Sequence, residues 1–511
     1  MVTVFPRRIA SGLLCIVLAG CAVSPPVNSL SAPDVPARWT EAPESSASVP
    51  QAAVAWWTVF HDRELDSLIR RAGQSSLDIR LAQARLRETR ARLSVASASL
   101  QPSVNATASY ARERESINAP APVLVNSDGQ IESPTGQSEN LFQAGFDASW
   151  ELDLFGARHR SVEAAQAEVD SSTYDRGAVA LTLFAEVARN YIAFRGFQQQ
   201  ILVARADLAA QQDMLNLVQA RYAGGLATGV DVARAAAQVK HLAAQIPALE
   251  TVRKNAVHRL SVLLGKSPGT LIAELSEIRP IPVARPDLSP GLPSDLLRQR
   301  PDIRRAEYRL AAATARLGVA TADMYPRFSM NGAAGLASVS AGDFFNSASL
   351  LWKIGPTITW PILRGGQIVA TIKVRDAQQQ QAFIAYRQAI LNGLEEVENA
   401  IVTYTQEQNR RAILADAVME NQRAVDLARS RYIGGLADFR DVLDMEHILS
   451  QARNALTRSD TALAIDLVAL YKSLGGGWRV AILPSAYSSS GHGLNCLAAG
   501  SKEEPKCSTS R

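Results

Sequence analysis

Residues 221–227 read Arg-Tyr-Ala-Gly-Gly-Leu-Ala, and residues 431–437 read Arg-Tyr-Ile-Gly-Gly-Leu-Ala. Each run follows a stretch without proline, because none of the 24 prolines falls in residues 157–246 or 362–483. Proline lacks a backbone donor and clashes inside a helix, so its absence over such lengths favours long helices. The 66 residues before each turn would form a helix about 100 Å long. The Gly-Gly pair then predicts that each helix reverses as an αα-hairpin.

The two runs belong to a repeat that covers most of the chain. The same offset of 210 residues relates three further, non-consecutive positions in each half: Gly145, Trp150 and Gly156 match Gly355, Trp360 and Gly366. Upstream the offset becomes 224, between Leu-Asp-Ile-Arg at 77–80 and Pro-Asp-Ile-Arg at 301–304. The difference of 14 residues predicts a loop inserted between Pro102 and Gly145. We therefore expect an internal two-fold repeat.

Alternating apolar and polar residues before each long helix predict β-strands. In residues 142–154 apolar side chains occupy every second position. Shorter alternations occur in 104–110 and 352–360, and Pro356 is expected to interrupt the latter. A helix should precede each pair of strands, from about residue 65 to 100 and from about residue 302 to 322. Each half thus predicts a helix, two strands and a long helical hairpin.

The predicted strands have the length that crosses a bilayer when tilted. Their apolar face would meet lipid and their polar face water. Four strands cannot close a barrel, and lipid does not tolerate an open sheet edge, so the chain must pool strands with copies of itself. Two chains give a filled eight-stranded interior, and three give twelve strands around a channel. We expect an α+β membrane protein, a homotrimer with a 12-stranded β-barrel continued by a long α-helical barrel in the periplasm.

The N-terminus predicts an export signal. Arg7 and Arg8 precede an apolar run that is too short to span a bilayer, and Leu-Ala-Gly-Cys closes it at Cys21. This ending resembles the bacterial lipobox, in which the cysteine thiol is diacylated; a plain signal peptide with an incidental cysteine is the alternative. Cys496 and Cys507 lie close together in a Ser/Gly-rich tail, where they either pair as a disulfide or stay free.

Composition and the repeat divide the chain into six segments. They are a lipoprotein signal peptide (1–20), a lipidated linker (21–55), a first repeat (56–265), a proline-rich segment (266–300), a second repeat (301–478) and a C-terminal tail (479–511).

Charge and motifs argue against several functional classes. Lys and Arg number 53 against 49 Asp and Glu, a net charge of +4 that is too small to indicate a nucleic-acid partner. Gly265-Lys266-Ser267 resembles the end of a P-loop, but the first glycine of that motif falls on Leu260. The six histidines show no metal-ligand spacing. We expect no enzymatic activity, cofactor or metal.

Five motifs between Trp56 and Trp478 carry a family resemblance. They are Trp56-Trp57 with Phe60, Asp62 and Leu65; Leu263-Leu-Gly-Lys-Ser-Pro-Gly; Gly291-Leu-Pro-Ser-Asp-Leu-Leu-Arg-Gln-Arg-Pro-Asp-Ile-Arg; the two Arg-Tyr-x-Gly-Gly-Leu runs; and Leu470-Tyr-Lys-Ser-Leu-Gly-Gly-Gly-Trp. All five resemble the TolC/OprM family of outer-membrane factors, and the lipobox resembles its lipidated drug-efflux branch.

The resemblance implies a passive duct in the outer membrane, lipid-anchored and with its helices in the periplasm. Such a homotrimer would export small toxic compounds (antibiotics, drugs, solvents or aromatic acids) that it receives from a periplasmic adaptor protein and an inner-membrane transporter. Two alternatives are a lipidated periplasmic adaptor, which has one hairpin rather than two, and an outer-membrane channel for protein secretion.

The resemblance also implies roles for the hairpin turns. We expect the adaptor to contact Gly224, Gly225, Leu226, Gly434, Gly435 and Leu436. A periplasmic gate is expected from Asp231, Asp441, Asp444, Tyr222, Tyr432 and Arg431. The alternative for the aspartates is ordinary helix capping, because acids in a first turn complement the helix dipole. An arginine frequent in the family is replaced by Ala437, so the link that closes the gate is expected to differ.

Overall fold

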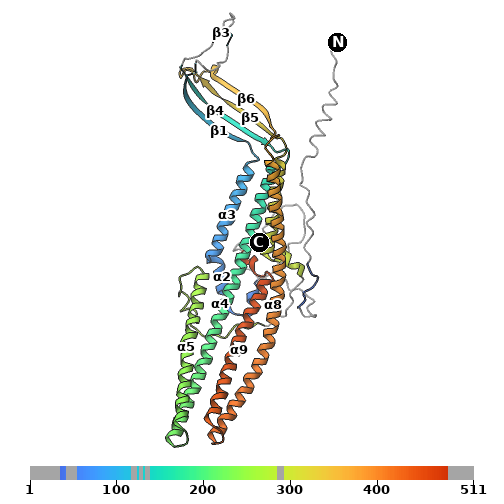
Figure 1. The fold of residues 1–511 in the computed structure, drawn as a ribbon. Coiled ribbons are helices and arrows are strands. Elements are labelled where there is room, and N and C mark those ends of the chain that lie inside the picture. Colours follow the sequence, from blue (N-terminus) through green and yellow to red (C-terminus); the bar gives the residue numbers. More distant parts are fainter. Residues whose placement is uncertain are drawn as a thin grey trace, which may run out of the picture.

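The computed structural model describes residues 35–41, 55–114, 116, 124–125, 131–132, 138–284 and 293–481. The chain is elongated, with a curved sheet at one end and the turns of two helical hairpins at the other (Figure 1). In these residues no helix is both long enough and apolar enough to cross a membrane.

The first half of the chain contains the elements expected from its pattern. Its helices are η1 (Trp56–Phe60), α2 (Arg63–Ser75), α3 (Leu77–Ala98), α4 (Ala157–Ala223) and α5 (Gly229–Leu263), and its strands are β1 (Ser103–Arg114), β2 (Leu124–Val125), β3 (Ile131–Glu132) and β4 (Ser138–Leu152). Helices α4 and α5 form the first predicted hairpin, which is confirmed.

The second half has a matching order of long elements. Its helices are η2 (Pro293–Asp295), α6 (Leu296–Gln299), α7 (Pro301–Ala322), η3 (Ser347–Ser349), α8 (Gln367–Ile433), α9 (Phe439–Ser473) and η4 (Trp478–Ala481), and its strands are β5 (Arg327–Ser338) and β6 (Leu350–Thr359). Helices α4 and α8 have 67 residues each, and α5 and α9 have 35 each. The second predicted hairpin is therefore confirmed as well.

Two local predictions are wrong. The single helix expected from about residue 65 to 100 is two helices, because Ser76 takes an extended ψ of 135° between α2 and α3. Strand β6 is not interrupted at Pro356, which pairs in register with Met330 of β5. Strand β6 is the last strand of the sheet, and an edge position tolerates a residue that cannot donate to the ladder.

The long strands form one antiparallel sheet in the order β1-β4-β5-β6, and one face of this sheet is polar. Asn105 donates to the carboxylate of Asp147 at 2.9 Å, and Ser149 donates to Asn331 at 2.9 Å. Asn331 in turn donates to the Thr357 hydroxyl at 3.0 Å. A row of hydrogen-bonded polar side chains therefore crosses all four strands.

The other face of the sheet carries large apolar side chains that are exposed in the single chain. They include Val104, Phe146, Trp150, Met330, Ile354 and Ile358. Trp150 and Trp360 donate their indole N–H groups to Leu100 O and Met324 O, at 3.0 and 3.1 Å. A sheet with one hydrated face and one apolar face has the pattern of strands that separate water from lipid.

Helix α4 is the centre of the helical part. It packs against α3, α5, α7 and α9, whereas α8 packs against α7 and α9 (Figure 1). The main hydrophobic core gathers around Trp56, Phe184, Tyr191 and Leu260, all of which are almost fully buried. Burial of each such side chain stabilises the fold by about 1.5–3 kcal/mol.

A buried arginine joins this core to the segment after α5. Arg195 Nη1 donates to Gln198 Oε1 and to Glu277 O, both at 2.7 Å, and Arg195 Nε donates to Tyr191 at 3.1 Å. Tyr191 donates to Asp62 at 2.8 Å, and burial raises the pKa of its hydroxyl. Because the buried guanidinium donates three hydrogen bonds within the core, we assign it to the stability of the fold.

A short N-terminal segment, residues 35–41, is held against α8. Trp39 is buried in a cluster with Ile303, Ile390 and Val397. The backbone N–H groups of Thr40 and Glu41 donate to the carboxylate of Glu398, at 2.8 and 3.2 Å. This part of the N-terminal chain therefore has a fixed position partway along the helical part.

Candidate functional site

The two hairpin turns have the same backbone. The second glycine of each pair, Gly225 or Gly435, adopts a positive φ of 74° or 72°. The leucine that follows donates its N–H to the carbonyl of the arginine five residues earlier, at 2.8 Å in both turns. This bond closes a helix C-terminus and requires the left-handed conformation that glycine adopts without strain. The tight turn explains the second glycine of each pair before any binding role is considered, whereas Gly224 and Gly434 have negative φ values of −83° and −73°.

The six residues predicted to contact an adaptor all lie exposed at the turns. They are Gly224, Gly225, Leu226, Gly434, Gly435 and Leu436. A Cβ atom built on Gly225 or Gly435 would meet nothing within 4 Å. Each turn therefore presents bare backbone and one exposed leucine, which is a small surface that another helix turn can approach closely.

The two returning helices begin with different caps. Thr228 is the N-cap of α5, and its hydroxyl accepts the N–H of Asp231 at 3.2 Å. The Asp231 carboxylate accepts the N–H and hydroxyl of Thr228 at 2.9 and 2.7 Å, and these bonds lower the pKa of Asp231. The equivalent N-cap of α9, Asp438, makes no capping hydrogen bond with its side chain. Asp231 thus has the capping role that is missing at the second turn.

The other two predicted gate acids lie on the exposed surface of α9. Asp441 is in its first turn and Asp444 is one turn further. The Asp444 carboxylate lies 3.7 Å from Arg440 Nε, and both side chains are largely exposed. An ion pair so exposed contributes little to stability. The side chains of Asp441 and Asp444 are therefore accessible from solvent in the single chain.

The two turn tyrosines have different surroundings. Tyr222 is 54% exposed, whereas Tyr432 is 5% exposed and its ring lies 5.5 Å from that of Phe439. The guanidinium of Arg221 lies 4.6 Å from the centroid of the Tyr432 ring, and its Nη1 donates to Ile433 O at 3.2 Å. Arg221 on the first hairpin therefore holds the turn of the second.

Arg221 is a residue of the turns that the sequence did not single out. The predicted arginine, Arg431, donates within its own turn to Leu436 O at 3.4 Å. The sequence contains a signal for both, since each stands directly before its turn tyrosine. That signal does not say which arginine reaches across, because the choice depends on how the hairpins pack.

A small hydrophobic cluster joins the two hairpins near the turns. It contains Met214, Leu215, Val218, Ala235, Val239, Tyr432, Phe439 and Val442. The hydroxyl oxygen of Tyr432 is buried there without a hydrogen-bond partner in the described part of the chain. An unpaired buried hydroxyl costs about 1–3 kcal/mol, so the contact between the hairpins includes a polar group that destabilises it.

Polar links between the hairpins continue above this cluster. Asp207 of α4 is buried and accepts from Ser450 at 2.6 Å and from Arg453 at 3.1 Å, both on α9. Within the second hairpin, Arg429 of α8 donates through Nε and Nη2 to Glu446 of α9, at 2.8 and 2.6 Å, although burial raises the pKa of Glu446. The hairpins are therefore joined by the Asp207–Arg453 ion pair as well as by apolar packing, and the Arg429–Glu446 ion pair joins the two helices of the second hairpin.

Three predicted residues, Cys21, Cys496 and Cys507, lie outside the described residues. Within the described ranges, no group of three or more His, Cys, Asp and Glu side chains could hold a metal ion.

Comparison with known proteins gives the chain a family. The family model described as outer membrane efflux protein matches residues 68–266 and 292–476. The pyoverdine export outer membrane protein OpmQ of Pseudomonas aeruginosa is 32% identical over 470 residues, which cover 91% of this chain and 96% of OpmQ. The toluene efflux pump outer membrane protein TtgC of Pseudomonas putida is 30% identical over 469 residues, which cover 90% and 94% of the two chains.

Solved structures agree with these relatives. The outer-membrane channel OprN superposes with a TM-score of 0.82 at 31% identity, over 90% of this chain and all of that chain. The open state of the Neisseria gonorrhoeae MtrE outer membrane channel superposes with a TM-score of 0.74 at 26% identity, over 90% and 99% of the two chains. The resemblance carried by the five sequence motifs is confirmed, and the chain belongs to the outer membrane efflux protein family.

Proposed function

We propose that three copies of the chain form a passive exit duct through the outer membrane. The observation that carries the proposal is the pair of open edges in the described chain. Strands β1 and β6 each pair on one side only, and α8 leaves apolar side chains exposed along its length. Lipid does not tolerate unpaired strand edges, so β6 of one copy would pair with β1 of the next. Identical head-to-tail contacts of this kind close into a ring.

Five of the nine large apolar residues that are exposed on α8 fall on a single line. They are Ile384, Leu391, Val402, Ile413 and Leu427. At 100° per residue, their spacings place all five within about 20° of one direction, over a length of about 65 Å. Leu77, Leu81 and Val95 form a comparable exposed row on α3. Apolar stripes of this extent mark interfaces, and a neighbouring copy offers the complementary edge.

Three copies suit a duct better than two. Eight strands would leave an interior that side chains fill, whereas twelve leave a channel. The polar face of the sheet, with Asn105, Asp147 and Asn331, would line this channel, and the apolar face would meet lipid. The helical walls of the three copies would continue the channel into the periplasm.

The cargo would be small toxic compounds handed over by a periplasmic adaptor and an inner-membrane transporter. Relatives are named for pyoverdine export, for toluene efflux and for antibiotic efflux, which supports small molecules without selecting one class. The exposed turns, with Leu226 and Leu436, would receive the adaptor. Energy would come from the inner-membrane partner.

The gate would lie at the second hairpin. Three copies would bring six carboxylates, from Asp441 and Asp444, towards one axis, where they would favour cations and bind polyvalent ones. Arg221 and Tyr432 would hold the second turn closed, in place of the arginine that Ala437 replaces. Tyr222 and Arg431 would contribute at the contact with the next copy. Asp231, which is engaged with Thr228, would cap its helix.

A lipid on Cys21 would be compatible with the position of the N-terminal segment. Glu398, which holds Thr40 and Glu41, lies 31 residues along α8 from its first residue, or about 46 Å from the sheet end of that helix. The 14 residues from Cys21 to Val35 can span at most about 46–50 Å. The tether would therefore reach the membrane with almost no slack. Removing four residues from 22–34 should detach Trp39, detected as increased Trp39 exposure to quenchers, or else prevent acylation.

The six segments predicted from the sequence, including the two repeats, are our proposed division of the chain. Two hairpins of equal length behind one sheet support a duct rather than an adaptor with a single hairpin. A protein-secretion channel is the remaining alternative. A transport assay, described next, separates the two by whether the chain exports a small dye or a protein.

The proposal is tested by assembly and by transport. Purified protein in detergent should scatter light as a trimer of the 55.0 kDa chain less its signal peptide, and a well-folded monomer would contradict the proposal. In a strain without its outer-membrane efflux proteins, the chain with a matching pump should lower ethidium accumulation. Unchanged accumulation alongside secretion of a protein substrate would favour the secretion alternative.

The proposed gate has its own test. The Asp441→Asn/Asp444→Asn trimer in a planar bilayer should lose its cation preference and its block by multivalent cations. The preference of the unmodified trimer should fade with salt, because the screening length falls from about 10 Å at 0.1 M to about 3 Å at 1 M. Identical selectivity and block in both proteins would return the two acids to a helix-capping role.

A further inference from the structure

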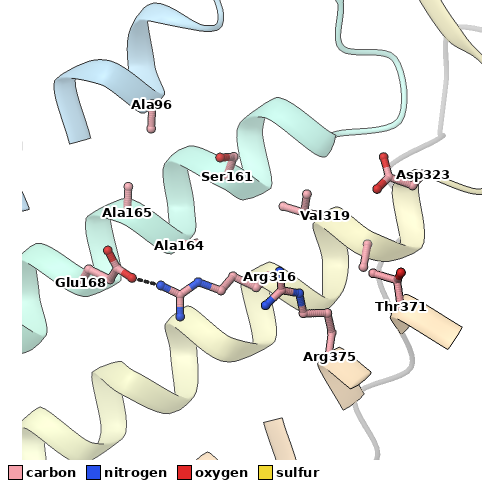
Figure 2. A pocket seen from close by; sticks show the side chains of 11 residues that line it. Ala96, Ser161, Ala164, Ala165, Glu168, Arg316, Val319, Asp323, Thr371 and Arg375 are labelled. Carbon is pink, nitrogen blue, oxygen red and sulfur yellow. Dashed lines mark ion pairs between the residues drawn. The ribbon is translucent and has the colours of Figure 1, made fainter. Parts of the chain in front are cut away.

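A cavity of about 330 Å³ lies directly below the sheet, where four helices come together. Its walls come from α3, α4, α7 and α8, and the side chains of Arg316 and Arg375 extend into it from neighbouring helices (Figure 2). Its size falls within the range of small-molecule sites. The turns and the gate play no part in it.

The two arginines of the cavity are not equally neutralised. Arg316 of α7 forms an ion pair with Glu168 of α4 (Figure 2). Arg375 of α8 donates to the neutral Gln378 at 2.9 Å, and no carboxylate of the described residues lies within ion-pair distance of it. Burial and the nearby charge of Arg375 lower the pKa of Arg316. The two guanidiniums therefore repel each other, and one of them lacks an anionic partner within the described chain.

A second cavity of about 180 Å³ continues the first towards the sheet. The two share Ala320, Asp323 and Thr371. The second adds Arg327, which pairs in register with Thr359 and forms an ion pair with Asp323 at 2.5 Å. With side chains alternating along a strand, Arg327 is on the same face of β5 as Asn331. The joined cavities therefore meet the polar face of the sheet.

The charge of the joined cavities is positive. Their lining includes four arginines, from Arg364 as well as the three already named, against the two carboxylates of Glu168 and Asp323. A guanidinium is always charged and presents a planar fork of donors that fits carboxylate and phosphate oxygens. A site with more of these guanidinium groups than carboxylates favours an anion.

We propose that the joined cavities bind a small organic anion in transit, a molecule bearing carboxylate or phosphate groups, with Arg316 and Arg375 as its main ligands. The inference rests on the proposed duct, because only there does the polar face of the sheet line the path of the cargo. The anion takes the place of the missing partner of Arg375 and shares Arg316 with Glu168. Three copies would place three such sites around the duct, just below the membrane.

Binding of carboxyfluorescein to the full-length protein in lipid-free detergent tests the site by fluorescence anisotropy. The dissociation constant should rise at least tenfold in Arg316→Gln/Arg375→Gln, and inorganic phosphate should compete with the dye in the unmodified protein. Arg423→Gln is the matched control, because Arg423 is an exposed arginine of α8 that pairs with Glu420, far from the cavity. Glu168→Gln should tighten binding, because it removes the carboxylate that competes for Arg316.

Equal affinities in the double variant and the unmodified protein would overturn the proposal, as would weaker binding in Glu168→Gln. If the double variant loses its thermal transition, Arg375→Gln, which breaks no ion pair, carries the test with the same expected direction. Dye binding abolished by nanodiscs containing phosphatidylglycerol would assign the site to a lipid headgroup and contradict an anion in transit. The binding assay does not depend on transport. A protein that binds the dye but forms no conducting trimer would contradict the proposed duct. A protein that forms a conducting trimer but does not bind the dye would contradict this site alone.

Discussion

Helices α4 and α8 have the same length and equivalent places in the two hairpins, yet they differ in burial. Twenty-six of the 67 residues of α4 are buried in the described chain, against seven of the 67 in α8. The buried set of α4 includes Phe184 and Tyr191, whereas the apolar residues Ile413 and Leu427 of α8 are 69% and 67% exposed. Similar helices have thus been placed in different environments by the fold of one chain.

This difference in burial shows which helix is covered by neighbours within one chain and which helix leaves apolar side chains uncovered. Helix α4 has neighbours around it and supplies the stability of the single chain. Helix α8 packs against α7 and α9, but its apolar stripe has no cover in the described chain, so in the proposed trimer the stripe would contribute through association. Substitutions in α4 should therefore change the folding of each chain, and substitutions in the stripe should change assembly at a given protein concentration.

The largest effect is expected from the stripe of α8. Ile413→Gln/Leu427→Gln should dissociate the proposed trimer, because each side chain would contribute about 2 kcal/mol by burial, or about 12 kcal/mol over the six in three copies. Light scattering across a dilution series measures the loss. The secondary structure of the dissociated chain, followed by circular dichroism, should be preserved.

Met419→Gln is the matched control for the stripe. Met419 is also an exposed apolar residue of α8, but it lies about 120° around the helix from Ile413. The trimer of this variant should persist at the same dilution. Dissociation of both variants to the same extent would mean that the stripe has no special part in assembly.

A smaller effect, on folding, is expected from the core of α4. Phe184→Ala should lower the free energy of unfolding by about 3–5 kcal/mol per chain, because it leaves a cavity beside Trp57, whose ring lies 5.4 Å from that of Phe184. Denaturant unfolding of a dissociated form, such as the stripe variant, isolates this loss from assembly. Ile384→Ala in the same background, at an α8 residue that is 65% exposed, should change the free energy of unfolding by less than about 0.5 kcal/mol. Equal losses would contradict the distinction between the two helices.

The caps of the returning helices should show a difference of about 1 kcal/mol. Thr228→Ala removes a capping bond and should destabilise the start of α5 by about that amount, whereas Asp438→Ala at the start of α9 removes none. Hydrogen exchange of the backbone amides at residues 229–232 and 439–442 measures local opening. Faster exchange in Asp438→Ala than in Thr228→Ala would reverse the assignment.

The smallest effect is a dependence on pH at the first turn. The pKa of Asp231 is below its ordinary value because Thr228 donates two hydrogen bonds to its carboxylate. The stability that this carboxylate provides is therefore present above its unfolded pKa of about 3.9 and is lost as the pH falls through its lower folded value. The exchange of residues 229–232 relative to 439–442 should increase over this acidic range in the unmodified protein and stay constant in Asp231→Asn. If the ratio of the two exchange rates stayed constant with pH in both proteins, protonation of Asp231 would not weaken the cap of α5.

Patterns within a few residues of one another predicted most of the elements. The absence of proline predicted α4 and α8, and alternation predicted β4. One local rule failed where context intervened: Pro356 was expected to interrupt its strand, but it lies inside β6. Pro247, just beyond the first proline-free stretch, likewise lies inside α5, which continues to Leu263. Packing against a neighbouring helix and an edge position in the sheet outweigh a local preference of a few kcal/mol.

The sequence by itself determined the hairpins, the turns and the amphipathic strands, because proline, glycine and the period of apolar residues act on the backbone close by. Only the tertiary structure decided that Arg221 rather than Arg431 reaches Tyr432, and that Arg316 and Arg375 share a cavity. The two Arg-Tyr-x-Gly-Gly-Leu runs are nearly identical, so nothing local distinguishes them. Such contacts join residues more than fifty positions apart, and they depend on which helices the whole fold brings side by side.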